Sequence, residues 1–179
     1  MNKFKIELAK LIILIGQNLF FVRGKIRNFF WRSALFLINY DTKSDPKNSR
    51  IKTKVNGVPF FFYFDYLSDV KLAFGNYNYK EINFIKKNMT KDSMFIDIGS
   101  NIGFYTMNIA DLFPKINFSK IISIEPNPIM IERQKENIEL LENIKKGIKN
   151  KIFLENYAIS ESEKNLQLNY EKGYGPAVL

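Results

Sequence analysis

The stretch with the clearest capacity for chemistry runs from Phe95 to Thr106 and reads FIDIGSNIGFYT. A short apolar run ends in Asp97, and Gly99 and Gly103 follow within six positions. Glycine allows a backbone turn with positive φ, and it lets a ligand approach where a Cβ would obstruct it. The spacing therefore predicts a turn at the end of a strand that can receive a small molecule.

The same turn distinguishes two classes of cofactor. A dinucleotide site needs G-x-G-x-x-G to fit a pyrophosphate, whereas this chain has D-x-G-x-x-x-G, with Ser100 where a second early glycine would stand. We expect Asp97 to repel an anion and to favour a cationic ligand. S-adenosylmethionine (SAM) carries a sulfonium and an ammonium group and no phosphate, so the pattern favours a SAM site.

A second acid ends the next expected strand. Glu125 follows the apolar run KIISI and stands 26 residues after Gly99. An acid in this place can accept hydrogen bonds from ribose hydroxyls, as it does in dinucleotide folds. The segment NYAIS after a third expected strand could frame the adenine with Ala158 and Ile159. In the alternative interpretation neither residue binds a ligand: Asp97 belongs to a simple turn, and Glu125 is a solvated strand end.

Alternating strands and helices must position these side chains. From Ser93 onward the order is SMFIDIG (strand), IGFYTMNIADLF (helix), KIISIEP (strand), PIMIERQKENIELLENI (helix) and KIFLENYAIS (strand). This β-α-β-α-β order predicts an α/β fold with a parallel sheet and right-handed crossovers. Ligands of such sheets bind beyond the carboxyl ends of the strands, where Asp97 and Glu125 are expected.

The residue types that are absent limit the mechanism. The chain has no cysteine and no histidine, which excludes thiolate nucleophiles, Ser-His-Asp and Cys-His mechanisms, and zinc sites built on these ligands. We predict no metal site, because no Asp/Asn-rich loop with calcium spacing occurs either. The catalytic residues stay unknown, since a base for a hydroxyl acceptor would have to be Asp, Glu, Lys or Tyr.

The formal net charge of +9 is concentrated at the amino-terminal end. Residues 1–40 contain seven Lys or Arg and one acid, whereas residues 41–179 contain twenty and seventeen. A nucleic-acid surface would need clustered Arg and Lys with interleaved aromatic residues on the body of the protein. We see no such cluster and predict no nucleic-acid partner.

Residues 1–40 form a basic amphipathic arm. Apolar residues recur at steps of three and four, which predicts helix, and they are Phe4, Leu8, Leu11, Ile15, Leu19, Val22, Ile26 and Phe29. The arm packs on the domain or on a partner chain in one reading. In the other it lies on a membrane, with the apolar face in lipid and the basic rim on anionic headgroups. No apolar run is long enough for a spanning helix, so we expect a cytoplasmic protein, peripheral to the membrane in the second reading.

A polar linker at residues 41–49, with Pro46, separates the arm from the body at residues 50–179. Asn56-Gly57 then predicts a β-hairpin, because both central positions of a type I′ turn need positive φ. Five of the six residues at 59–64 are aromatic. We expect this hairpin to cover the sheet or to roof the site.

FIDIGSNIGFYT, IISIEPNP and NYAIS together resemble the FkbM-type family of SAM-dependent methyltransferases. The family pattern is acid-x-Gly-Ala-Asn-x-Gly, then Glu-Pro-Asn-Pro, then Ala-Leu/Ile-Ser. The resemblance covers roughly residues 50–170, with Ser100 in place of the usual Ala and Asn78 where an acid is common. It implies a Rossmann-like class I methyltransferase sheet and methylation of a hydroxyl on a sugar, glycan or secondary metabolite.

The resemblance also implies roles for single residues around the cofactor. The methionine end would be lined by Asp97, Gly99, Asn101 and Gly103, the ribose by Glu125, and the adenine side by Asn127 and Ala158.

The family's later strand, with its Lys-x-Asp-x-Glu-Gly motif, has no counterpart after Ser160. We therefore expect residues 50–179 to be the amino-terminal portion of the domain, truncated at its carboxyl end, with strands 3-2-1 of the sheet present. The outer edge of SMFIDI would then be unpaired, which favours self-association.

Three functions stay open on this basis. The first is a SAM-dependent O-methyltransferase that acts on a small-molecule or glycan acceptor. The second is an incomplete or noncatalytic SAM-binding fragment. The third is a membrane-attached interaction protein whose α/β body is a scaffold.

Overall fold

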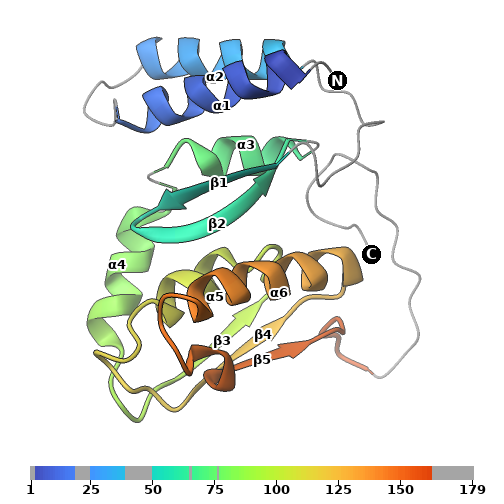
Figure 1. The fold of residues 1–179 in the computed structure, drawn as a ribbon. Coiled ribbons are helices and arrows are strands. Elements are labelled where there is room, and N and C mark those ends of the chain that lie inside the picture. Colours follow the sequence, from blue (N-terminus) through green and yellow to red (C-terminus); the bar gives the residue numbers. More distant parts are fainter. Residues whose placement is uncertain (1–2, 19–24, 39–49, 65, 76, 163–179) are drawn as a thin grey trace. The chain divides into compact units, whose positions relative to one another are not determined.

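The computed structural model describes residues 3–18, 25–38, 50–64, 66–75 and 77–162. These residues form two compact units that meet in the sequence between Tyr77 and Asn78, and each is described by itself (Figure 1). The expected linker at 41–49 and the segment after Ser162 lie outside the described residues. The expected limits of the methyltransferase portion stay a prediction.

The first unit contains a helical pair, a β-hairpin and a short helix. Its elements are α1 (Lys3–Asn18), α2 (Lys25–Ile38), β1 (Arg50–Val55), β2 (Val58–Tyr63) and α3 (Leu67–Ala73). The hairpin is confirmed: β1 and β2 pair antiparallel up to Val55 and Val58. Asn56 and Gly57 between them have φ of 56° and 85°, as a type I′ turn requires.

Aromatic side chains form the core of this hairpin. The rings of Phe60 and Phe62 are both buried and stack with their centroids 5.4 Å apart. Asp69 on α3 accepts a hydrogen bond from the backbone N–H of Tyr63 at 2.7 Å, which ties α3 to the end of β2. The expectation that the hairpin roofs the site is not tested, because it belongs to the first unit and the site to the second.

The helical prediction for the arm is confirmed, but its apolar stripe is not the packed face. Four residues of the stripe, Phe4, Leu11, Ile15 and Phe29, are exposed, whereas Ile6 and Ile13 of α1 are buried. Apolar residues surround α1 on more than one side, and periodicity alone does not tell which side meets protein.

The second unit contains the predicted alternation of strands and helices. Its elements are α4 (Tyr79–Asn88), β3 (Met94–Ile98), α5 (Phe104–Ala110), β4 (Lys120–Ile124), α6 (Pro128–Glu142), the 3₁₀ helix η2 (Ile148–Lys151) and β5 (Ile152–Glu155). The strands form a parallel sheet in the order β3-β4-β5. The chain is therefore α/β with a three-stranded parallel sheet.

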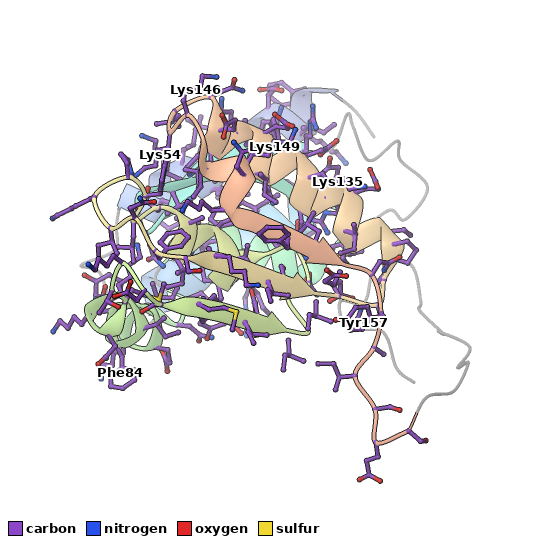
Figure 2. All side chains as sticks on the ribbon, turned by 90° about the horizontal axis from the view of Figure 1, so that it is seen from below. Lys54, Phe84, Lys135, Lys146, Lys149 and Tyr157 are labelled. Atoms are coloured by element: carbon purple, nitrogen blue, oxygen red, sulfur yellow. The ribbon has the colours of Figure 1, made fainter. Side chains whose placement is uncertain are left out.

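The two faces of this sheet differ. Helices α5 and α6 lie on the same side of the strands (Figure 1), and the side chains of Ile121 and Ser123 are buried. The register places Ile96, Ile122 and Phe153 in one row across the three strands. Figure 2 views the sheet from below, and no described helix crosses in front of the strands there.

Helix α5 is shorter than the sequence pattern predicts. It begins at Phe104 rather than near Ile102, because Gly103 adopts a left-handed φ of 76° as its N-cap. It ends at Ala110, and Pro114 follows within one turn, where a further helical N–H could not be donated. Among the described residues, no helix has the length and apolar character needed to cross a membrane.

Candidate functional site

The glycine turn follows β3 and is held against the end of β4. Three of its residues, Gly99, Asn101 and Gly103, have positive φ of 72°, 51° and 76°. The backbone N–H groups of Gly99 and Ser100 both donate to the carbonyl oxygen of Ile124, at 2.9 and 3.1 Å. The sharp turn expected from the glycines is therefore present, and it lies beside the residue that precedes Glu125.

Glu125 clamps this turn with its carboxylate. Its Oε2 accepts the backbone N–H of Asn101 at 2.8 Å, and its Oε1 accepts the backbone N–H of Asn127 at 2.9 Å. The side chain is buried, with 7% of the residue exposed. A carboxylate has about four lone-pair sites, so each oxygen retains capacity for one more donor. The structure thus brings Glu125 and the turn together, as expected for the ends of adjacent strands.

Asp97 lies below the turn, on the sheet face that carries the helices. Its Oδ2 accepts both the backbone N–H and the Oγ1 hydroxyl of Thr106, at 3.0 and 2.7 Å. Thr106 is the third residue of α5, and its N-cap Gly103 has no side chain. Asp97 therefore caps α5 from a strand, in the role that an N-cap side chain usually fills.

Burial sets the electrostatics of Asp97. The residue is 8% exposed, and this desolvation raises the pKa of its carboxyl above the ordinary value, with the two bonds from Thr106 acting in the opposite direction. An ionised Asp97 would hold a negative charge close to the glycine turn. This placement is compatible with the expected preference for a cationic ligand.

A chain of buried polar side chains continues from Asp97 to the far side of the turn. The hydroxyl oxygens of Thr106 and Ser123 lie 3.1 Å apart, and Ser123 donates to Gln134 Oε1 at 2.7 Å. Gln134 Nε2 then donates to Ser100 Oγ at 2.8 Å and to the carbonyl of Asn101 at 2.6 Å. The conformation of the turn is thus fixed from the sheet and from α6 at once.

The sequence reasoning missed Thr106, Ser123 and Gln134 as parts of the site. The sequence offered a signal for Ser123, because this polar residue interrupts an apolar strand. The burial of Gln134 is seen only in the structure. Buried polar groups need partners, so Ser123 could have been marked as a member of a network, but not assigned to the turn.

The two glycines of the turn have different surroundings. A Cβ at Gly103 would lie 3.0 Å from Gln134 Oε1, so this glycine is required by packing as well as by its φ. A Cβ at Gly99 would meet no atom of the described residues within 4 Å. The space beside Gly99 is therefore open, and this is where a ligand could approach the backbone.

The remaining predicted site residues have structural partners near the same strand ends. Asn101 Oδ1 accepts the N–H of Ile102 at 2.7 Å, and Asn127 Oδ1 accepts the N–H of Ile129 at 2.9 Å as the N-cap of α6. Ala158 follows β5 and is half-buried. Their roles around an adenine stay predictions.

Asn156, which the sequence reasoning did not single out, connects the third strand to the site. Its Nδ2 donates to the carbonyl oxygens of Glu125 and Pro126, at 2.8 and 2.9 Å. The segment that contains Ala158 is thereby tied to the end of β4. Within the described ranges, no three His, Cys, Asp or Glu side chains gather where they could hold a metal ion.

The solved structures that resemble this chain include two from Pyrococcus species, and both have low similarity to it. The crystal structure of "putative transferase PH0793" from Pyrococcus horikoshii is 21% identical, with a TM-score of 0.44 over 62% of this chain and 37% of that chain. The tRNA (uracil-54, C5)-methyltransferase of Pyrococcus abyssi, in complex with S-adenosyl-L-homocysteine, is 14% identical, with a TM-score of 0.40 over 66% of this chain and 26% of that chain. The chain thus spans about a third of the length of these proteins. No protein-family model and no curated sequence matches it.

Proposed function

We propose that this chain is the cofactor-binding portion of a SAM-dependent methyltransferase that transfers a methyl group to a hydroxyl. One observation carries the proposal. The backbone N–H of Asn101 in the glycine turn donates to Oε2 of Glu125 at 2.8 Å, so a turn and an acid lie together at the carboxyl ends of two parallel strands. Ligands of such sheets bind beyond these strand ends. The sequence resemblance to FkbM-type enzymes implies that the acceptor is a hydroxyl on a sugar, glycan or secondary metabolite.

The residues present fit this cofactor. The backbone at Gly99 is open to a ligand, and both oxygens of Glu125 retain acceptor capacity for ribose hydroxyls. Asp97 adds negative charge near the turn, which favours the ammonium and sulfonium groups. The pattern lacks the glycines that a pyrophosphate needs, and this disfavours a dinucleotide.

When bound, SAM would supply an electrophilic methyl group on its sulfonium. The contribution of this chain would be to bind and orient: Glu125 at the ribose, the turn at the methionine end, and Asn127 and Ala158 on the adenine side. Orientation of an acceptor oxygen in line with a leaving group is a large part of catalysis in such a displacement. The base that takes the hydroxyl proton is not assigned to a residue.

The test is calorimetric titration of the full chain with S-adenosylhomocysteine (SAH), beside NAD⁺. We expect SAH to bind and NAD⁺ not to bind. Glu125→Gln should weaken SAH binding by about 1.5–3 kcal/mol, or roughly 10- to 150-fold, because a charged acceptor of ribose hydroxyls is lost. The matched control is Glu155→Gln, which removes an acid from the end of the neighbouring strand, where it pairs with Ile124 rather than with the turn.

The control distinguishes the loss of a ribose contact at Glu125 from the mere loss of a negative charge at the carboxyl ends of the strands. Glu155→Gln should bind SAH as the parent does. A folded parent protein that binds no SAH would contradict the proposal, as would equal weakening by both substitutions. Turnover on a panel of hydroxylated acceptors then distinguishes an enzyme from a noncatalytic SAM-binding fragment.

A further inference from the structure

The first unit exposes apolar side chains that its own packing does not use. On α1, Leu11 and Ile15 are one helical turn apart and exposed, whereas Ala9 and Ile13 are fully buried. On α2, Phe29 and Phe36 are 66% and 81% exposed, whereas Ala34 is fully buried. Residues seven apart share a helix face, so each helix has a packed face and a separate exposed apolar face.

The packed face of α1 is already satisfied within the unit. A Cβ on Gly16 would lie 2.5 Å from the ring of Phe74, which shows how closely the helix approaches the end of α3. The side chain of Gln17 donates to the carbonyl of Ala73 and accepts the hydroxyl of Thr53, the latter at 2.8 Å. This side of α1 therefore contacts α3 and the hairpin of the same unit.

The segment that contains both helices carries mostly positive charge. Residues 1–40 carry seven Lys or Arg and one acid. That acid, Glu7, pairs with Lys10 at 2.8 Å. Arg32 lies between Phe29 and Phe36 in the sequence and is exposed. Large apolar side chains with a basic surround complement an anionic lipid surface, where apolar groups enter the acyl boundary and basic groups meet the headgroups.

We propose that the exposed faces of α1 and α2 bind an anionic lipid bilayer, with both helices lying along its surface. We call this surface the arm face and define it by Leu11, Ile15, Phe29, Arg32 and Phe36. It would hold the second unit near a membrane. This proposal does not depend on the proposed function.

Vesicle co-sedimentation of the full chain tests the arm face. We expect the protein to sediment with vesicles of phosphatidylcholine and phosphatidylglycerol, to stay in the supernatant with phosphatidylcholine alone, and to be released by salt.

Two variants, one of them a double substitution, test whether lipid binding depends on the arm face, and each has a matched control. Phe29→Ser with Phe36→Ser should lower the bound fraction by about tenfold or more, since two large apolar groups would no longer enter the lipid. Phe84→Ser, at a phenylalanine of α4 that is 70% exposed and labelled in Figure 2, should leave binding unchanged. Arg32→Glu should weaken binding at low salt more than Lys54→Glu, an exposed lysine of β1.

Several outcomes would overturn the proposal. The parent protein could stay in the supernatant with anionic vesicles, or its sedimentation could be independent of lipid charge and salt. Phe84→Ser could also reduce binding as much as the double substitution does. Sedimentation velocity without lipid tests a further outcome that would overturn the proposal. If the double substitution dissociates an oligomer, the arm face is an interface between protein chains instead. Circular dichroism of each variant establishes that it is folded before these comparisons are made.

Discussion

Residues at the glycine turn have structural contacts in addition to the binding roles proposed for them. A Cβ on Gly103 would lie 3.0 Å from Gln134 Oε1, and Gln134 Nε2 donates to the carbonyl of Asn101. Glu125 holds the backbone of the turn while it keeps acceptor sites for a ligand. A substitution at Glu125 therefore changes stability as well as binding, and Gly99 is the position where the two effects can be told apart.

Gly99→Ala should weaken SAH binding beyond its cost in stability. A left-handed φ costs an L-residue about 1–2 kcal/mol, and the Cβ would enter the open space beside the turn. Gly57→Ala is the matched control, because Gly57 also has positive φ and also has no atom within 4 Å of a Cβ. Chemical denaturation should show similar losses for both variants.

Only Gly99→Ala should then lose affinity for SAH in calorimetry. If both variants bind SAH as the parent does, the space beside Gly99 does not hold the cofactor. If both bind weakly, the loss follows from stability and not from the site.

At the scale of elements, β3 and α5 are connected through one carboxylate. Asp97 caps α5 from the strand, and Thr106 links it to Ser123 on β4. Because burial raises the pKa of Asp97, ionisation of this group costs free energy in the folded state and not in the unfolded chain. The contribution of Asp97 to stability is therefore complete below the pKa of unfolded Asp, about 3.9, and falls as pH rises from there through the folded pKa.

Asp97→Asn and Thr106→Val should change this pH dependence in opposite directions. The asparagine cannot ionise and can still accept the N–H of Thr106, so the variant should gain stability relative to the parent as pH rises above about 4. Thr106→Val removes a hydrogen bond to the ionised form, so it should lose stability relative to the parent over the same range. Urea denaturation across this pH range measures both differences.

The same two variants also test the role of Asp97 in binding. If its charge favours the ammonium group of the cofactor, Asp97→Asn should bind SAH more weakly at neutral pH although its fold should then be more stable than that of the parent. A pH profile of stability that Asp97→Asn leaves unchanged would contradict the assignment of this cost to Asp97.

At the scale of the whole molecule, the second unit has an open sheet face and an open sheet edge. Met94, Ile96, Ile98 and Phe153 are each about half-exposed on one face, and β3 has no strand on its outer side among the described residues. Parallel sheets are usually covered on both faces. Lys120 and Glu155 stand on this face at opposite ends of β4 and β5, so two copies packed with antiparallel strands would bring opposite charges together.

We therefore expect the chain to self-associate through this face. Sedimentation velocity over a range of concentrations should show a reversible oligomer, and Ile96→Asp should shift it to monomer because a charge would be buried in an apolar interface. Ile144→Asp, at an exposed isoleucine after α6, is the control and should leave the association unchanged.

A monomeric parent at all concentrations would contradict self-association. In that case the melting temperature of Ile96→Asp tests whether something other than a second copy covers this face. A fall in melting temperature would indicate that the face is covered by another part of the same chain.

The amino-acid sequence alone determines the local features of this protein. The hairpin turn at Asn56-Gly57, the strand-helix alternation after Ser93 and the sharp turn at Gly99 all depend on the conformational preferences of a few adjacent residues. The parallel order of three strands follows from the length of the helical connections between them. These features could be read from the sequence because each depends on short-range chemistry.

Only the tertiary structure decides which side chains meet. Gln134 reaches Asn101 across 33 positions of the chain, and Asp97 reaches the first turn of α5 although it was expected to face a ligand. The stripe on α1 is apolar, yet Ile6 and Ile13 on another side are the ones that pack. Partners that are distant in sequence are selected by how elements pack, and periodicity within one element carries no information about its neighbours.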